Sequence, residues 1–303
     1  MEIRIGAGGW QYFNVGKTDR LRAYARAFDL TEVNSTFYEF PSKKLAQSWR
    51  NRVPNNFEFS VRCHYSLTHQ LKFAPSRKVF EILDKMRRIC QLLRASILHF
   101  QTPPTLKWSS SKILDFENFV SSLNSDGLRL AMETRSEAKI PLALFRVMSE
   151  NNIIHSVDIS KEQPKVESDI LYSRLFGKGH HTIYQFSDNE LEAISKSARS
   201  AKNRALLAFH NVRMYKDAGR LKIYQQTDRF ASITKFVDLE SLKEVLAEDA
   251  CFPATKQELI EAQGWKLYDV RIDRRERVSN ALERLPEKTY QNLGELITAL
   301  KTR

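Results

Sequence analysis

The sequence predicts an α/β fold, a TIM-type (β/α)8 barrel followed by a small C-terminal all-α module. Eight short apolar, β-rich segments alternate with helical patterns over the first three quarters of the chain, and after Tyr224 only helical patterns remain. Strands that alternate with helices form parallel sheets, and eight strands close a barrel. We therefore expect a barrel domain over residues 1–227 and a helical module over residues 228–303.

The expected strands are apolar runs bounded by polar or turn residues. They fall near residues 3–7, 30–33, 57–61, 96–100, 128–132, 153–157, 171–175 and 205–209. The expected barrel helices fall near residues 20–28, 42–51, 76–93, 113–123, 141–150 and 189–202. In the C-terminal module, helices are expected near residues 239–246, from about 255 onward, over 274–285 and over 293–300.

One alternative is an open, doubly wound sheet. The polar segment 161–165, between the sixth and seventh strands, is short for a crossover helix. However, Gly6-Ala7-Gly8-Gly9-Trp10 lacks the Gly-x-Gly-x-x-Gly spacing of a dinucleotide-binding turn. The barrel is therefore the preferred interpretation.

Composition narrows the class of protein. No apolar run approaches the roughly 18 residues that span a bilayer, and the first residues lack the basic and apolar regions of a signal peptide. The three cysteines are far apart in sequence, which argues against disulfides and thiolate zinc sites. We expect a cytoplasmic protein without a membrane partner.

The charge is strongly positive and unevenly distributed. The net charge is +12, and residues 1–227 hold 35 Lys and Arg against 22 Asp and Glu. A domain this basic favours an anionic ligand, with DNA or RNA first. The alternative is a basic surface that serves solubility or thermal stability.

The expected second strand ends in the segment Glu32-Val33-Asn34-Ser35-Thr36-Phe37-Tyr38. In a parallel barrel the binding groups lie at the carboxyl ends of the strands, so this polar ending indicates a functional site. The alternative is a turn that caps the next helix. Polar residues also follow the other strands, and their concentration at carboxyl ends strengthens the case for a site.

Three arginines, Arg62, Arg135 and Arg174, lie at or near strand ends and are candidates for holding phosphate. Glu32 and Glu133 could instead neutralise two of them inside the barrel mouth. For proton transfer the candidates are Glu32, Glu133 and His69. A carboxylate beside arginine stays ionised and would act as a base.

The remaining candidates for substrate binding are Trp10, Asn34, Tyr38, Gln101 and Asn211, which follow the first, second, fourth and eighth strands. Aromatic rings beside basic groups can stack on bases or sugars, or they can simply pack the loops over the barrel. We expect no metal ligands and no cofactor. A divalent metal is the alternative, because Glu, His and Asp residues occur at the strand ends, but the nearby arginines would repel a cation.

These motifs resemble the YecE-like family, domain of unknown function 72. The residues that carry the likeness are Gly8-Gly9-Trp10, Glu32-Val33-Asn34-Ser35-Thr36-Phe37-Tyr38, Thr68-His69, Glu133 with Arg135, and Arg174 with Gly177. The resemblance implies a TIM barrel over about residues 1–225 with no established activity. Phe176 and His210 depart from the family pattern, which would suit a different ligand.

The C-terminal segment resembles a second family, domain of unknown function 2795, through Phe252–Leu259 and Leu285–Tyr290. The leading functional hypothesis is a phosphate-bearing ligand, foremost nucleic acid, bound at the C-terminal barrel face, with phosphodiesterase or nuclease activity as its extension. One alternative is an enzyme acting on a sugar phosphate or carboxylate. Another is a non-enzymatic scaffold that recruits a protein partner through the C-terminal helices, so the sequence leaves open whether the chain is an enzyme.

Overall fold

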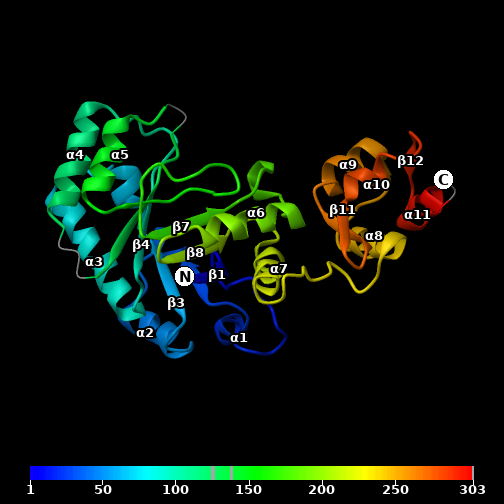
Figure 1. Cartoon of the computed structure of the whole chain (residues 1–303), viewed down its shortest axis with the longest axis horizontal. Coiled ribbons are helices and arrows are strands. Elements are labelled where there is room, and N and C mark those ends of the chain that lie inside the picture. The colour runs from blue at the N-terminus through cyan, green and yellow to red at the C-terminus, as the bar shows by residue number, and fades with distance from the viewer. Residues whose placement is uncertain (124–126, 137–138, 302–303) are drawn as a thin grey trace. The chain divides into compact units, whose positions relative to one another are not determined.

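The computed structural model describes residues 1–123, 127–136 and 139–301. Their contacts divide the chain into two compact units (Figure 1). Unit 1 contains residues 1–175 and 196–210, and unit 2 contains residues 176–195 and 211–303. None of the described helices is long and apolar enough to cross a membrane.

Eight parallel strands form a closed barrel in unit 1. The strands are β1 (Glu2–Ala7), β2 (Leu30–Val33), β3 (Glu58–Arg62), β4 (Ile97–Gln101), β5 (Arg129–Glu133), β6 (Ile154–His155), β7 (Ile170–Leu175) and β8 (Arg204–Phe209). They are hydrogen-bonded in the order β6-β5-β4-β3-β2-β1-β8-β7, and a parallel bridge between Val157 and Ser173 joins the two ends of the sheet. The predicted TIM-type barrel is therefore confirmed, and the open sheet is excluded.

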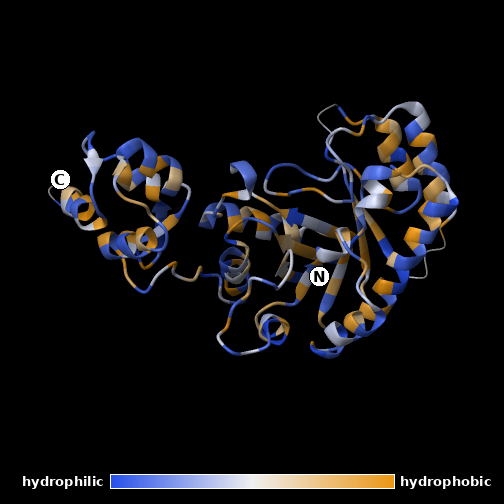
Figure 2. Ribbon diagram, turned by 180° about the vertical axis from the view of Figure 1, so that it is seen from behind, coloured by the Kyte–Doolittle hydropathy of each residue, from blue (hydrophilic) through white to orange (hydrophobic). Residues whose placement is uncertain are grey.

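Five helices of unit 1 connect these strands (Figure 1). They are α1 (Arg20–Ala27), α2 (Lys43–Asn51), α3 (Arg77–Leu93), α4 (Ser110–Ser121) and α5 (Leu142–Glu150). The side chains of Asp19, Ser42, Ser76 and Ser109 accept hydrogen bonds from the first turns of α1 to α4, which explains why those helices begin there. Hydrophobic and hydrophilic residues alternate along these helices, as an amphipathic barrel helix requires (Figure 2).

The barrel interior starts with a layer of apolar side chains. Its members are Leu30, Ile97, Ala131, Ile154, Ile170, Tyr172, Leu206 and Ala208. Side chains two residues apart on a strand point to the same face of the sheet. The residue that lies two positions after each of these apolar side chains therefore also faces the interior, closer to the carboxyl ends.

Among the described residues, unit 2 contains five further α-helices and the first part of α6 (Asp188–Arg199). They are α7 (Met214–Thr227), α8 (Asp238–Ala247), α9 (Lys256–Gln263), α10 (Val278–Leu282) and α11 (Leu293–Lys301). Leu242, Leu246, Val278, Leu282 and Leu296 are among the buried residues of its separate core. The apolar pattern of the sequence does not predict helix α7, because the buried face of this helix includes the charged residues Asp217 and Arg220.

The C-terminal module is not entirely helical. Strands β10 (Leu267–Arg271) and β11 (Arg274–Arg277) form an antiparallel hairpin, and β9 (Ala254–Thr255) pairs with β12 (Thr289–Tyr290). The expected helix over residues 274–285 is wrong in its first part, because cross-strand pairing with β10 takes residues 274–277 into a strand. Only α10 remains helical within that range.

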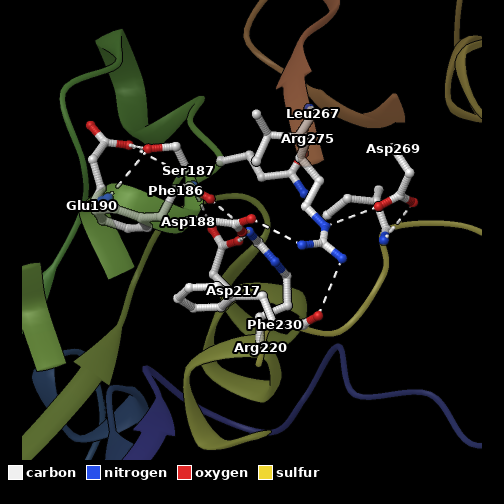
Figure 3. A network of polar contacts seen from close by, with 12 residues as sticks. Phe186, Ser187, Asp188, Glu190, Asp217, Arg220, Phe230, Leu267, Asp269 and Arg275 are labelled. Atoms are coloured by element: carbon white, nitrogen blue, oxygen red, sulfur yellow. Dashed lines mark hydrogen bonds and ion pairs between the residues drawn. The ribbon is translucent and has the colours of Figure 1, made fainter. Parts of the chain in front are cut away.

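A buried ion-pair network connects the segments of unit 2 (Figure 3). Arg275 Nη1 lies 3.0 Å from Asp188 Oδ2, and Arg275 Nε lies 3.0 Å from Asp269 Oδ1. Asp188 also pairs with Arg220, whose Nη1 lies 3.0 Å from Asp217 Oδ1. The contacts within the chain therefore place residues 211–227 in the same compact unit as the C-terminal segment. The division into a barrel domain of residues 1–227 and a module of residues 228–303 stays a prediction.

Candidate functional site at the barrel mouth

A polar layer follows the apolar layer at the carboxyl ends of the barrel strands. Each member lies two positions after an interior apolar residue on the same strand or its continuation. The members are Glu32 after Leu30, His99 after Ile97, Glu133 after Ala131, Arg174 after Tyr172, and His210 after Ala208. The period of two along a strand therefore aims ionisable side chains from five strands at one central space.

Arg174 joins the two carboxylates at the centre of this layer. Its Nη1 lies 2.6 Å from Glu133 Oε2 and its Nη2 lies 3.1 Å from Glu32 Oε1. The Arg174 side chain is 3% exposed, so both ion pairs are shielded from water. The sequence left open whether arginines bind ligand or pair internally, and Arg174 pairs internally with both carboxylates.

Glu32 is ionised and fully buried. Tyr172 donates a hydrogen bond from its hydroxyl group to Glu32 Oε2 at 2.5 Å, and Ser60 Oγ lies 2.9 Å from that hydroxyl group. Burial raises the pKa of Glu32, but the charge of Arg174, together with His210, His99 and the hydrogen bond from Tyr172, outweighs burial and lowers the pKa to about 2. Glu32 is consequently a charged partner of Arg174 at neutral pH and a weak proton acceptor.

Glu133 is less deeply buried than Glu32, with 11% of its side chain exposed. Gln101 Nε2 donates to its Oε1 at 2.9 Å, and Arg135 Nε donates to the same oxygen at 2.5 Å. Burial raises the pKa of Glu133, but Arg174 and Arg135 outweigh it, so the pKa lies well below the ordinary 4.5. Arg135 itself is exposed.

Two neutral histidines complete the layer. Burial, assisted by the charge of Arg174, lowers the pKa of both His99 and His210 to about 3. His99 Nε2 lies 3.5 Å from Glu133 Oε2 and its Nδ1 lies 3.7 Å from Glu32 Oε2. Neither histidine can supply a proton at neutral pH.

His210 is close to the backbone of the first strand end. A Cβ atom on Gly8 would lie 2.3 Å from two atoms of the His210 ring and 2.9 Å from Asn34 Nδ2. Asn34 Nδ2 in turn donates to Gly8 O at 2.7 Å. Glycine at position 8 thus permits the close approach of His210 and Asn34.

Arg62 is the last residue of β3 and lies in register with His99 of this layer on the neighbouring strand β4. Its guanidinium carbon is 3.7 Å from the centre of the Phe37 ring, its Nη2 donates to Gln101 Oε1, and its Nη1 lies 3.5 Å from Asn34 Oδ1. Its Nε is buried without a hydrogen-bond partner among the described residues. Burial, together with the charge of Arg174, lowers the pKa of Arg62 to about 10.

His69 lies near the same arginines on η2 (Ser66–Gln70). Its Nδ1 is 2.8 Å from Thr68 Oγ1, and its ring packs edge-to-face with Phe37 at 5.0 Å between centroids. Partial burial and the charges of Arg62 and Arg135 lower the pKa of His69 below the ordinary 6.5. It is half-buried, and its titration is therefore sensitive to charge at the mouth.

The remaining predicted residues lie outside the central cluster. Trp10 packs edge-to-face with Trp49 and Phe59, at 5.3 and 6.4 Å between centroids. Tyr38 is 67% exposed. Asn211 belongs to unit 2, where its amide donates to Tyr184 O at 2.8 Å and to Asp217 Oδ2 at 2.7 Å, so its side chain is committed to that unit.

The donor set does not suit a divalent metal. Among the described residues, no group of three or more His, Cys, Asp or Glu side chains is placed to hold one. Glu32 and Glu133 are paired with Arg174, and a second cation beside Arg174 would be repelled.

The chain belongs to the family of proteins of unknown function DUF72, whose match covers residues 4–229. The structure resembles that of a DUF72 family protein from Enterococcus faecalis V583, with a TM-score of 0.58 and 18% sequence identity over 75% of this chain and 98% of the other. It also resembles a DUF72 family protein from Thermotoga maritima MSB8, with a TM-score of 0.57 and 18% identity over 76% of this chain and 100% of the other. No curated protein matches the sequence.

A more distant likeness is to an AP endonuclease of family 2 from Brucella melitensis, with a TM-score of 0.47 and 11% identity over 75% of this chain and 98% of the other. The likenesses to solved structures establish the fold alone, and the chemistry must come from the residues. The family match ends at residue 229, so the likeness of the C-terminal segment to domain of unknown function 2795 stays a prediction.

His99 lies beside both carboxylates, and His210 and Tyr172 contact Glu32, but the sequence analysis does not select these three as site residues. A signal for the two histidines was available in the sequence. His99 and His210 each lie two positions after an apolar residue of a predicted strand, and two-residue spacing places such residues on the same face.

Proposed function

We propose that the C-terminal end of the barrel binds a phosphate-bearing anion, with nucleic acid as the leading class, through Arg62 and Arg135. The observation that supports this proposal most directly is the net charge of the side chains at the barrel mouth. Glu32 and Glu133 are ionised and both pair with Arg174, while His99 and His210 are neutral. The three arginines Arg62, Arg135 and Arg174 therefore outnumber the two carboxylates, which leaves the cluster with a positive surplus even though Arg135 also pairs with Glu133.

The roles expected for the three arginines divide accordingly. Arg174 directs its Nη atoms at the carboxylates and acts as their counter-ion. Arg62 has a buried Nε without a hydrogen-bond partner among the described residues, and Arg135 is exposed. A planar guanidinium group of this kind matches the oxygen atoms of a phosphate.

A phosphodiesterase activity would need a group that transfers protons near neutral pH. The low pKa values of Glu32 and Glu133 make them poor for this task. His69 suits it better, because a phosphate between Arg62 and Arg135 would offset the two charges that now lower its pKa. His69 is therefore the proposed proton-transfer group, and Glu32 and Glu133 position Arg174.

The choice of nucleic acid rests on the basic excess of residues 1–227. The test measures binding of fluorescently labelled oligonucleotides by anisotropy between 50 and 200 mM salt, the range over which protein–phosphate contacts weaken binding by orders of magnitude. We expect a steep loss of affinity with salt. Arg62→Gln should reduce the slope of log K against log salt by about one.

The matched control is Lys222→Gln, which removes a charge from helix α7 in unit 2. It should leave the slope close to that of the wild-type protein. Binding that does not respond to salt, or no binding at all, would overturn the proposal. Nuclease activity on DNA and RNA, measured with and without His69→Asn, tests the catalytic extension separately.

A sugar phosphate or carboxylate is the second candidate ligand, since Arg62 and Arg135 would recognise its anionic group equally well. If this candidate is correct, a small phosphate monoester should compete with the oligonucleotide for the site. The slope of log K against log salt should then be near one, because only one phosphate is contacted.

Recruitment of a protein partner by the C-terminal helices is favoured by Ile272, which is 81% exposed in the β10–β11 hairpin. That role predicts that Ile272→Ser weakens partner binding without changing oligonucleotide affinity.

A further inference from the structure

A chain of ring contacts leads from Arg62 to the surface of unit 1. Phe37, beneath the guanidinium group of Arg62, packs edge-to-face with Tyr38 at 4.9 Å between centroids and contacts Tyr65 at 5.9 Å. Tyr65 contacts His64 at 4.7 Å, and His64 stacks on Phe40 at 4.3 Å with 12° between the planes. We call these five rings, Phe37, Tyr38, Tyr65, His64 and Phe40, the aromatic ladder.

The backbone holds the exposed ring of the ladder in place. Tyr38 N donates to Ser35 O at 3.0 Å, and His64 Nε2 donates to Tyr38 O at 3.1 Å. His64 Nδ1 accepts from Ser66 N at 3.2 Å. The His64 ring therefore has both nitrogen atoms satisfied as a neutral imidazole, and burial lowers its pKa, which favours that form.

The ladder exposes rings between two cations. Tyr38 is 67% exposed and Phe40 is 37% exposed. Lys85 Nζ lies 5.3 Å from the centre of the Phe40 ring at one end, and Arg62 lies over Phe37 at the other. Single exposed hydrophobic residues are common on protein surfaces. A connected set of rings with a cation at each end is the arrangement that binds bases and phosphates together.

We propose that the aromatic ladder binds the unpaired bases of a single-stranded nucleic acid, whose backbone phosphate is held at Arg62. This inference rests on the proposed function and specifies its substrate class. Bases within a duplex are stacked on one another and offer no free face to Tyr38 or Phe40, whereas bases of a single strand do. The positive charges of Arg62 and Lys85 complement the phosphates between those bases.

The test uses the full chain and three labelled probes of equal length: an oligodeoxythymidine strand, a duplex, and a strand of abasic sugar phosphates. Anisotropy titrations at one salt concentration should rank the oligodeoxythymidine strand tightest. Tyr38→Ala should weaken its binding about 5- to 100-fold, the loss expected for one base–aromatic stack. Tyr38→Phe keeps the ring and should bind like the wild-type protein.

The abasic strand isolates the stacking contribution. It should bind the wild-type protein at least as weakly as the oligodeoxythymidine strand binds Tyr38→Ala, and Tyr38→Ala should not weaken its binding further. Phe236→Ala, which removes a 54% exposed ring from unit 2, is the control for loss of any exposed ring and should leave all three affinities unchanged.

Two results would overturn the proposal that the aromatic ladder binds unpaired bases, while leaving the proposed function intact. One is duplex binding as tight as single-strand binding, and the other is unchanged affinity in Tyr38→Ala, each with the Arg62→Gln effect on the salt slope preserved. Displacement of the strand by an equal concentration of oligoglutamate would also overturn it, in favour of an acidic peptide. Absence of binding to every probe would overturn the proposed function itself.

Discussion

Arg174 and Glu32 form an ion pair in which both side chains are almost entirely shielded from solvent. The Nη2 and Oε1 atoms are 3.1 Å apart, and the side chains are 3% and 0% exposed. Removing two charges from water is costly, and the cost is recovered only when the pair and its remaining hydrogen bonds are complete. The buried centre of the barrel mouth is thus a fixed support, and the proposed ligand contacts are assigned to Arg62 and Arg135 beside it.

Replacing Arg174 should be strongly destabilising. Arg174→Met leaves Glu32 buried without its arginine partner and leaves Glu133 paired with Arg135 alone, and we expect a loss of about 3–5 kcal/mol in the free energy of unfolding. Urea denaturation followed by circular dichroism measures it. The double variant Arg174→Met with Glu32→Gln should lose less than the sum of the single losses, because it removes one of the stranded charges. A loss below about 1 kcal/mol in Arg174→Met would contradict this account.

Stability should fall as the solution is acidified below pH 6.5. His99 and His210 have pKa values of about 3, below the ordinary 6.5, so between these values the unfolded chain binds protons that the folded chain does not. Their contribution is complete above pH 6.5 and is lost as pH falls toward 3. Glu32, with a pKa of about 2 against 4.5, adds the same trend at lower pH. Each such proton changes stability by about 1.4 kcal/mol per pH unit.

The effect of Asp217, in unit 2, on the pH dependence of stability is opposite to that of the two histidines, because burial raises its pKa from 3.8 to about 6. Its contribution to stability is present below pH 3.8 and lost as pH rises through 6. The variant His99→Gln separates the effects, since it removes one histidine and leaves Asp217 unchanged. The stability difference between the wild-type protein and His99→Gln should shift in favour of the variant between pH 6.5 and 4.5 in urea titrations. A difference that stays constant over this range would argue against a buried neutral His99.

Binding of an anion should raise the pKa of His69. Arg62 and Arg135 lower that pKa in the free protein, and an anion held between them would offset their charge. Nuclear magnetic resonance titration of the imidazole protons, assigned by comparison with His69→Asn, should show an upward shift in saturating inorganic phosphate. Arg62→Gln should raise the pKa of His69 without any phosphate. If phosphate leaves the His69 titration unchanged, the anion does not bind beside it.

In unit 2, Arg275 should matter far more than its neighbour Arg274. Arg275 is 3% exposed and pairs with Asp188 and Asp269, so Arg275→Met should cost about 3–5 kcal/mol (Figure 3). Arg274 is 62% exposed, and its pair with Glu276 should contribute less than about 1 kcal/mol. Thermal unfolding of Arg275→Met and Arg274→Met compares the two. Equal effects would mean that the network in unit 2 does not carry this stability.

Much of the barrel could be predicted from local sequence. Strand β2 begins and ends at Leu30 and Val33 as expected, and helix α3 differs from expectation by one residue, because apolar spacing and Ser76 at the N-cap are local signals. Residues 274–277 could not be predicted in the same way. Their strand depends on pairing with residues 267–271, which a local helical pattern does not reveal.

The sequence by itself determined the barrel and the placement of Glu32, Arg62 and Glu133 at strand ends, because both follow from spacing along the chain. Only the tertiary structure decided which arginine is neutralised. Arg174 comes from β7, whereas its two carboxylate partners come from β2 and β5, more than 40 positions away in the chain. Closure of the barrel brings these strands around one interior, and the distances created there set the charge of every group at the mouth.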